Sequence, residues 1–217
     1  MTVTDGPSTP ADVNRDDAVR RAVVLNRFSI AYNATESVVA LAAGFAAGSV
    51  SLIGFGLDSV IEISASGILA WRLMAEKRSG CTQATDRRAT RLIALSFFAL
   101  AGYVGFESIE RLLSGEEPET SVIGIVLTSL SLVIMPFLAR AKRRVAPALG
   151  SRAQEAEANQ TWLCFYMSAV VLFGLVVHAV LGWWWADPAA GIGIAALAGV
   201  EGLRTWRADS LEDTCCG

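Results

Sequence analysis

Two acidic residues lie four positions apart inside an apolar stretch of the chain. Asp58 and Glu62 stand in the segment 51–73, which is long enough to cross a bilayer as one helix. A carboxylate at bilayer depth costs about 2.5–3.5 kcal/mol on insertion scales, so such residues mark a function by default. Because positions i and i+4 share one face of a helix, both carboxylates are aimed at one point. We expect a divalent cation to be held there, although a buried polar network that joins helices is the plainer alternative.

Three further polar residues are candidates for the same site: Glu36, Gln160 and Cys164. Glu36 lies near the middle of another apolar stretch, where it is either a ligand or a glutamate hydrogen-bonded to a neighbouring helix. Gln160 and Cys164 lie four apart on a polar stripe. A thiolate would favour a softer ion such as Zn²⁺, whereas a free cysteine can also be a small buried apolar residue. The amide of Gln160 is a weak oxygen donor and could stand beside the ligands instead.

The elements that must position these residues are long apolar segments. Hydrophobic residues make up 53% of the 217 residues, and the mean hydropathy is +0.46, which is typical of membrane proteins. Segments of about 20 residues match the thickness of a bilayer core. We predict six of them, at residues 23–47, 51–73, 91–113, 120–139, 161–182 and 188–206. The fourth has a mildly polar side with Thr128 and Ser131.

Positive charge is concentrated on one side of these segments. Arginine and lysine residues cluster before the first segment, between the second and third, between the fourth and fifth, where Lys142 lies, and after the last. Arg111 falls on the other side. The positive-inside rule then places both termini in the cytoplasm, in agreement with an even number of crossings. The predicted fold is an all-α membrane protein, a bundle of six transmembrane helices.

The ends of the chain are expected to lie outside this bundle. Residues 1–20 read as a flexible cytoplasmic tail, residues 21–207 as the six-helix transmembrane domain, and residues 208–217 as a short cytoplasmic tail without room for a soluble domain. Cys81, Cys215 and Cys216 fall on the cytoplasmic side, where thiols stay reduced. Before the last segment, Asp187 and Pro188 read as a helix N-cap followed by proline at the first helical position.

With these residues described, the chain resembles the transmembrane domain of the cation diffusion facilitator family, without that family's cytoplasmic C-terminal domain. The resemblance rests on three features and covers about residues 22–207. They are Ala47-Gly48-Ser49-Val50-Ser51-Leu52 leading into Gly56-Leu57-Asp58-Ser59-Val60-Ile61-Glu62, the stretch Trp185-Ala186-Asp187-Pro188, and the order of six segments with both ends inside.

The resemblance implies a secondary transporter rather than an enzyme, without a prosthetic group. Proteins of that family are dimeric exporters of Zn²⁺ and related ions driven by proton antiport. Their central site takes two acidic or histidine residues from each of the second and fifth spans. Asp58 and Glu62 match the first pair, whereas Gln160 and Cys164 stand where His or Asp and Asp would be expected.

The expected partners are therefore a divalent metal ion, protons, membrane lipid and a second copy of the chain, with no nucleic acid. The expected location is the plasma (inner) membrane of a bacterium. Deprotonated Asp58 and Glu62 would bind the ion on the cytoplasmic side, and protons would release it on the other by alternating access.

The altered second pair leaves another function class open. A non-transporting membrane protein that uses the same fold for regulation or partner binding is the main alternative. A membrane-embedded enzyme using Glu36, Asp58 and Cys164 ranks last, since no pairing of a base with a nucleophile is evident.

Overall fold

The computed structural model describes the backbone of residues 10–79, 83–149 and 152–211, and the side chains of residues 20–67, 91–145 and 158–207. Over these residues the chain is a succession of long helices. They are α1 (Pro10–Ala47), α2 (Val50–Ser79), α3 (Gln83–Ser114), α4 (Val122–Leu149), α5 (Arg152–Leu181) and α6 (Ala186–Leu211). α1 therefore begins within the segment expected to be an N-terminal tail, and α6 ends within the segment expected to be a C-terminal one.

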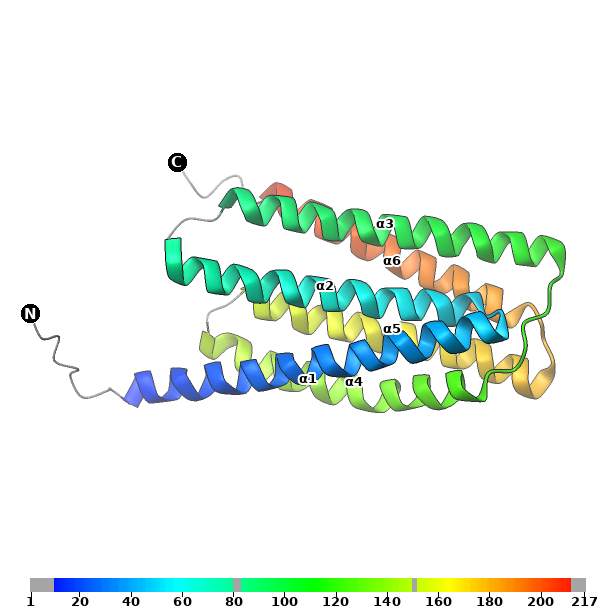
Figure 1. The fold of residues 1–217 in the computed structure, drawn as a ribbon, viewed down its shortest axis with the longest axis horizontal. Helices are drawn as coiled ribbons and strands as arrows, with labels where there is room; N and C mark the ends of the chain where they lie inside the picture. Colours follow the sequence, from blue (N-terminus) through cyan, green and yellow to red (C-terminus); the bar gives the residue numbers. More distant parts are fainter. Residues whose placement is uncertain (1–9, 80–82, 150–151, 212–217) are drawn as a thin grey trace, which may run out of the picture.

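The helices run up and down a single elongated bundle (Figure 1). α3 packs mainly against α6, α4 against α5, and α1 against both α2 and α4, while α2 also contacts α3, α5 and α6. α1 begins and α6 ends at the same end of the bundle, which we call the terminal end. The opposite, far end holds the short α1–α2, α3–α4 and α5–α6 connections.

Glycine residues stop the three helices that run toward the far end. Gly48, Gly115 and Gly182 follow α1, α3 and α5 and have φ angles of 62°, 70° and 66°, a backbone conformation that residues with a Cβ rarely adopt. The N–H of Gly115 donates to the carbonyl of Arg111 at 3.0 Å, and the N–H of Gly182 donates to the carbonyl of His178 at 2.9 Å. These bonds satisfy carbonyls that the end of a helix would otherwise leave unpaired.

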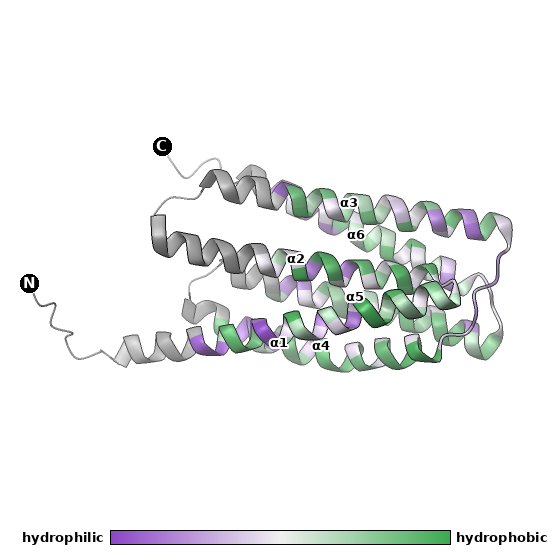
Figure 2. Cartoon of the chain, in the orientation of Figure 1, coloured by the Kyte–Doolittle hydropathy of each residue, from purple (hydrophilic) through white to green (hydrophobic). Residues whose placement is uncertain are grey.

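The bundle exposes large apolar side chains on its outside and buries several charged and polar residues within its apolar core. Figure 2 shows hydrophobic residues along the helices, and large side chains such as Phe45, Phe106, Phe137 and Phe173 are each at least 67% exposed. Glu36, by contrast, is only 1% exposed. An outer surface of large apolar side chains with buried carboxylates inside suits a bundle surrounded by lipid.

Within the part of the chain that the structure describes, five helices are long and apolar enough to cross a membrane: the segments Arg20–Ala47, Val50–Gly67, Arg91–Ser114, Val122–Val145 and Ala158–Leu181. They correspond to the first five predicted crossings. The sixth helix forms where it was predicted and is rich in alanine and glycine. Length and composition support the first five crossings as candidates, and the sixth crossing stays a prediction.

Small residues allow α1 and α2 to approach closely. A Cβ atom placed on Gly56 would lie 2.9 Å from Cγ of Leu41 and 3.1 Å from Cβ of Ala40, and one on Gly44 would lie 2.9 Å from the backbone nitrogen of Ile53. Close approach through glycine and alanine is the usual way in which membrane helices pack. It brings the inner faces of α1 and α2 together along the half of the bundle next to the far end.

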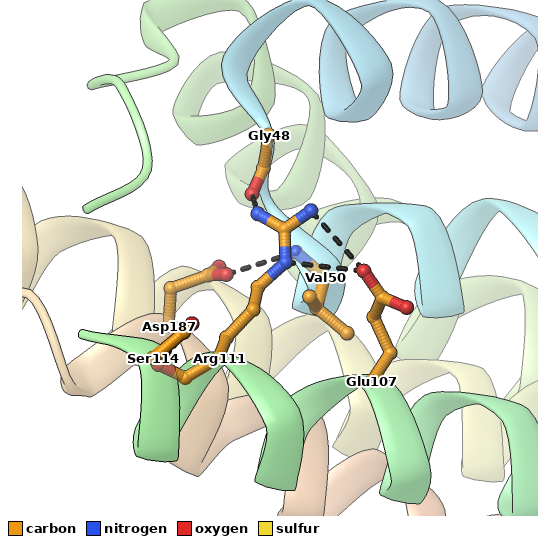
Figure 3. Close-up of polar contacts among 6 residues, drawn as sticks. All are labelled: Gly48, Val50, Glu107, Arg111, Ser114 and Asp187. Atoms are coloured by element: carbon orange, nitrogen blue, oxygen red, sulfur yellow. Dashed lines mark hydrogen bonds and ion pairs between the residues drawn. The ribbon is translucent and has the colours of Figure 1, made fainter. Parts of the chain in front are cut away.

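Asp187 ties α6 to the start of α2 (Figure 3). The carboxylate is fully buried and accepts hydrogen bonds from the hydroxyls of Ser49 at 2.6 Å and Ser51 at 2.5 Å, and from the N–H of Val50 at 2.9 Å. α6 begins at Ala186, so Asp187 lies inside its first turn. The prediction that Asp187 is the N-cap of its own helix was wrong, because its side chain caps α2 instead.

Arg111 on α3 contacts the turn between α1 and α2. Its guanidinium donates to the carbonyl of Gly48 and lies 3.3 Å from a carboxylate oxygen of Glu107 (Figure 3). The residues of the two stretches that carry the family resemblance, Gly48 to Ser51 and Asp187, therefore meet in one buried cluster at the far end.

Replacement of Asp187 by alanine should lower the stability of the bundle. It would leave two hydroxyls and one N–H without their acceptor, and each unsatisfied buried group costs about 1–3 kcal/mol. Thermal unfolding of the purified protein in detergent should show a clear drop in midpoint for Asp187→Ala. Glu117→Ala, which removes an exposed acid at the same end, should leave the midpoint unchanged. Equal midpoints for both variants would contradict the role assigned to Asp187.

Candidate metal centre

The two carboxylates of α2 are buried inside the bundle. Asp58 is 3% exposed and Glu62 is 1% exposed, one helical turn apart on a helix that contacts α1, α3, α5 and α6. The flanking residues Leu57 and Ile61 pack against the apolar core, and Val60, on the opposite side of the helix, is exposed. The sequence expectation that both acids face inward is confirmed.

Asp58 carries the clearest sign of an incomplete site. Its Oδ1 atom is fully buried and accepts no hydrogen bond from any residue whose side chain is described. The carboxylates of Glu62 and Glu36 lie near enough to act electrostatically on it. A buried polar group without a partner is costly, and nearby like charges add to that cost. A bound cation would relieve both penalties.

Glu36 joins α1 to three other helices. One carboxylate oxygen accepts a hydrogen bond from Ser131 on α4, and the other accepts from Ser59 on α2 at 2.9 Å and from the thiol of Cys164 on α5 at 3.8 Å. The hydroxyl of Ser131 also pairs with that of Tyr32 at 2.8 Å. In this conformation Glu36 is thus a glutamate hydrogen-bonded to its neighbours, the second of the two interpretations that its sequence position allowed.

Cys164 and Gln160 differ in how they relate to the carboxylates. Cys164 is fully buried, is a free thiol and contacts Glu36. Gln160 lies one turn away on α5 and is half-buried, and its Nε2 has no hydrogen-bond partner among the described side chains. The structure thus brings Cys164 to the acidic cluster, while no contact between Gln160 and an acid is observed.

Lys142 belongs to the interior rather than to a loop. The sequence places it among the positive charges between the fourth and fifth segments, but α4 continues to Leu149 and the side chain is 0% exposed. Its ammonium donates to the hydroxyl of Thr161 at 3.1 Å, and that hydroxyl donates to Glu62 at 3.3 Å. The helical spacing from Ser131 through Met135 and Ala139 to Lys142, all buried, is the signal that would have found it.

The sequence predicts a mildly polar side of the fourth segment at Thr128 and Ser131, but it does not predict that hydroxyl groups donate to the acids. Ser59, Ser131 and Thr161 are all buried and each donates to a carboxylate. Single serines and threonines are common in membrane helices, where they also bond to their own backbone, so sequence position alone does not distinguish the two uses.

Among the described side chains, the candidate metal ligands do not surround one common point. Among the side chains that the structure describes, no three from His, Cys, Asp and Glu lie close enough together to hold one ion. In this conformation hydroxyls donate to Glu36 and Glu62, and the Lys142 ammonium donates to one of those hydroxyls, that of Thr161. A shared ion would require the candidate ligands to move closer together.

Comparison with known proteins places this bundle in a family. The cation efflux transmembrane domain matches residues 89–212, which is more than half of the chain and covers α3 to α6. The chain is 29% identical over 186 residues to the cation-efflux pump FieF of Shewanella oneidensis, covering 81% of this chain and 61% of that protein. It is 28% identical over 167 residues to the magnetosome protein MamB of Paramagnetospirillum magneticum, covering 74% and 56%.

A third relative is an uncharacterized transporter of Methanocaldococcus jannaschii, 27% identical over 175 residues, covering 78% of this chain and 62% of that protein. The chain spans roughly half to three fifths of the length of these curated relatives. The chain therefore belongs to the cation efflux family, also called the cation diffusion facilitator family, whose members are integral membrane transporters and not enzymes.

Proposed function

We propose that this protein is a secondary transporter of divalent metal cations, with Zn²⁺ as the best fit, and that it exports them in exchange for protons. Asp58 and Glu62 on α2 would hold the ion near mid-membrane. The observation that carries the proposal is the buried Oδ1 of Asp58, which has no hydrogen-bond partner among the described residues and lies one turn from a second buried carboxylate. The name of FieF, a cation-efflux pump, agrees with this direction of transport.

The ligand set favours a borderline-soft ion. Cys164 would add a sulfur donor and Glu36 a third carboxylate, since these two side chains already touch. Zn²⁺ accepts sulfur and oxygen ligands together, whereas Mg²⁺ and Ca²⁺ select oxygen alone. Gln160 would contribute a weak oxygen donor or stand beside the ligands. Its position one turn before Cys164 repeats the spacing of the α2 pair.

The transport cycle that we propose is alternating access. With the site open to the cytoplasm, deprotonated Asp58 and Glu62 bind the ion, and movement of α2 and α5 against their neighbours completes the coordination. After the site opens to the other side, protons compete for the same oxygens and release the ion. All six helices would cross the inner membrane of a bacterium with both termini in the cytoplasm, and the working unit would be a homodimer in lipid.

A second function stays in view because one observation favours it. Where the family resemblance implies two metal-binding side chains on α5, this chain has Gln160 and Cys164, and in the described conformation Glu36 is served by hydroxyls. If the buried polar residues only stabilise the bundle, the protein would regulate or bind a partner and would not transport ions.

Transport by the purified protein distinguishes these two functions. Liposomes that enclose a zinc-sensitive dye should show Zn²⁺ uptake that is accelerated by a pH gradient of acidic interior. Asp58→Ala should reduce the initial rate to the level of empty liposomes, because the ion loses one of its two α2 ligands and Glu62 is the only carboxylate that α2 still supplies.

The matched control is Glu110→Ala, which removes an exposed acid of α3 without touching the interior. It should transport like the unmodified protein. Undiminished flux with Asp58→Ala would rule out the proposed site, and no flux above empty liposomes with the unmodified chain would favour the regulatory function.

Binding of Zn²⁺ should weaken as the pH falls. The ligating carboxylates must be deprotonated to bind, so each one that titrates lowers the apparent affinity by up to about tenfold per pH unit on the acidic side. Isothermal titration calorimetry between pH 7.5 and 5.5 measures this slope. Asp58→Asn, which cannot titrate at that position, should show a shallower slope as well as weaker binding. A slope that is the same in both proteins would exclude Asp58 as a competing site for protons.

A further inference from the structure

Lys142 lies within a chain of buried hydrogen bonds that links four helices. Its ammonium donates to the hydroxyl of Ser29 on α1 at 2.9 Å and to that of Thr161 on α5 at 3.1 Å. Thr161 in turn donates to Oε1 of Glu62 on α2 at 3.3 Å. We call these four residues the Lys142 bridge. Each of them is at most 1% exposed.

The bridge lies on the terminal-end side of the candidate metal centre. On α4, Lys142 is about 16 Å nearer the terminal end than Ser131, at 1.5 Å per residue. On α1, Ser29 is about 10 Å nearer that end than Glu36, by the same measure. On α5, Thr161 comes one turn before Cys164 in the same direction. An ion approaching the carboxylates from the terminal end between these helices would meet the bridge first.

The side chains of the Lys142 bridge are suited to close a path to the metal centre and to open it again. A lysine ammonium is a compact cation on a flexible four-carbon stem with three donors, so it can change partners by rotation of its own side chain. A buried ammonium is tolerated only while its donors are satisfied. Its positive charge would also oppose the entry of a dication along the same path. An apolar residue would close the path as well, but it could not be held by Ser29 and Thr161.

We propose that Lys142 is a gating residue, which closes the metal centre from the terminal end by joining α1 and α5 and, through Thr161, the Glu62 carboxylate. Entry of an ion from that end requires the ammonium to leave Ser29 and Thr161. This inference rests on the proposed transport function, but the experiment that tests it involves no metal, so either can fail without the other.

Cys164 is a built-in reporter for this gate. It is fully buried and lies one turn beyond Thr161 on the same helix. In a background in which Cys81, Cys215 and Cys216 are serine, Cys164 is the single thiol left. Its rate of modification by a positively charged, membrane-impermeant methanethiosulfonate reports how often the path is open. The reagent is applied to proteoliposomes from the terminal-end side or from the far-end side.

Lys142→Met should raise the rate of Cys164 modification from the terminal-end side by about tenfold or more, because hydrogen bonds from a charged group no longer hold the closed state. The rate from the far-end side should not change. Arg144→Met removes an exposed positive charge from the same turn of α4 and should leave both rates unchanged. Thr161→Val, which keeps the shape but cuts the link to Glu62, should give a smaller increase from the terminal-end side.

An unchanged rate with Lys142→Met in a protein whose thermal midpoint stays within a few degrees of the parent would overturn the proposal. So would an equal increase from both sides, which would mean that the lysine only stabilises the bundle. If Lys142→Met does not fold, the rates of Cys164 modification in Thr161→Val and Ser29→Ala test the proposal instead. A selective increase from the terminal-end side supports the gate, and unchanged rates in both reject it.

Discussion

A carboxylate inside the hydrocarbon layer has no water from which to accept hydrogen bonds, so Glu36, Asp58 and Glu62 depend on groups that neighbouring helices supply. Several buried side chains donate these hydrogen bonds. Ser131, Ser59 and Cys164 donate to Glu36, and Thr161 donates to Glu62. Asp58 keeps one oxygen without a donor from the described side chains. A cation bound at this oxygen would supply the missing partner, which is why we propose a metal site there rather than a polar network alone.

The two ends of the bundle are built differently around this centre. At the far end, Asp187 and Arg111 hold the α1–α2 turn from two other helices, with a carboxylate that has several short hydrogen bonds. Toward the terminal end, Lys142 links α1 and α5 through hydrogen bonds from a long, flexible side chain. Among the described residues, the far end is therefore joined by a buried acid with several short hydrogen bonds, whereas the terminal-end side is joined by a side chain that can change partners.

The sequence predicted the helices and the α2 acids because both have strong local signals: long apolar segments, and two carboxylates at helical spacing where lipid would exclude them. It did not predict the partners of those acids. The apolar run of the fourth segment ends before Lys142, and only the helical spacing from Ser131 to Lys142 indicates that α4 continues with Lys142 on its buried face. Local spacing also favours Asp187 as the cap of its own helix and cannot reveal that its carboxylate reaches α2. The partners of both side chains depend on contacts between helices distant in sequence, which no local pattern encodes.

X-ray absorption at the zinc edge tests the central claim most directly. The sample is Zn²⁺-loaded protein in which Cys81, Cys215 and Cys216 are serine, so that Cys164 is the single source of protein sulfur ligation apart from methionine. Our account predicts oxygen ligands at about 2.0–2.2 Å and one sulfur at about 2.3 Å. It further predicts that Cys164→Ser removes the sulfur and that Asp58→Ala abolishes stoichiometric zinc. A shell of oxygen and nitrogen that is the same in all three proteins would place the metal elsewhere and contradict the account.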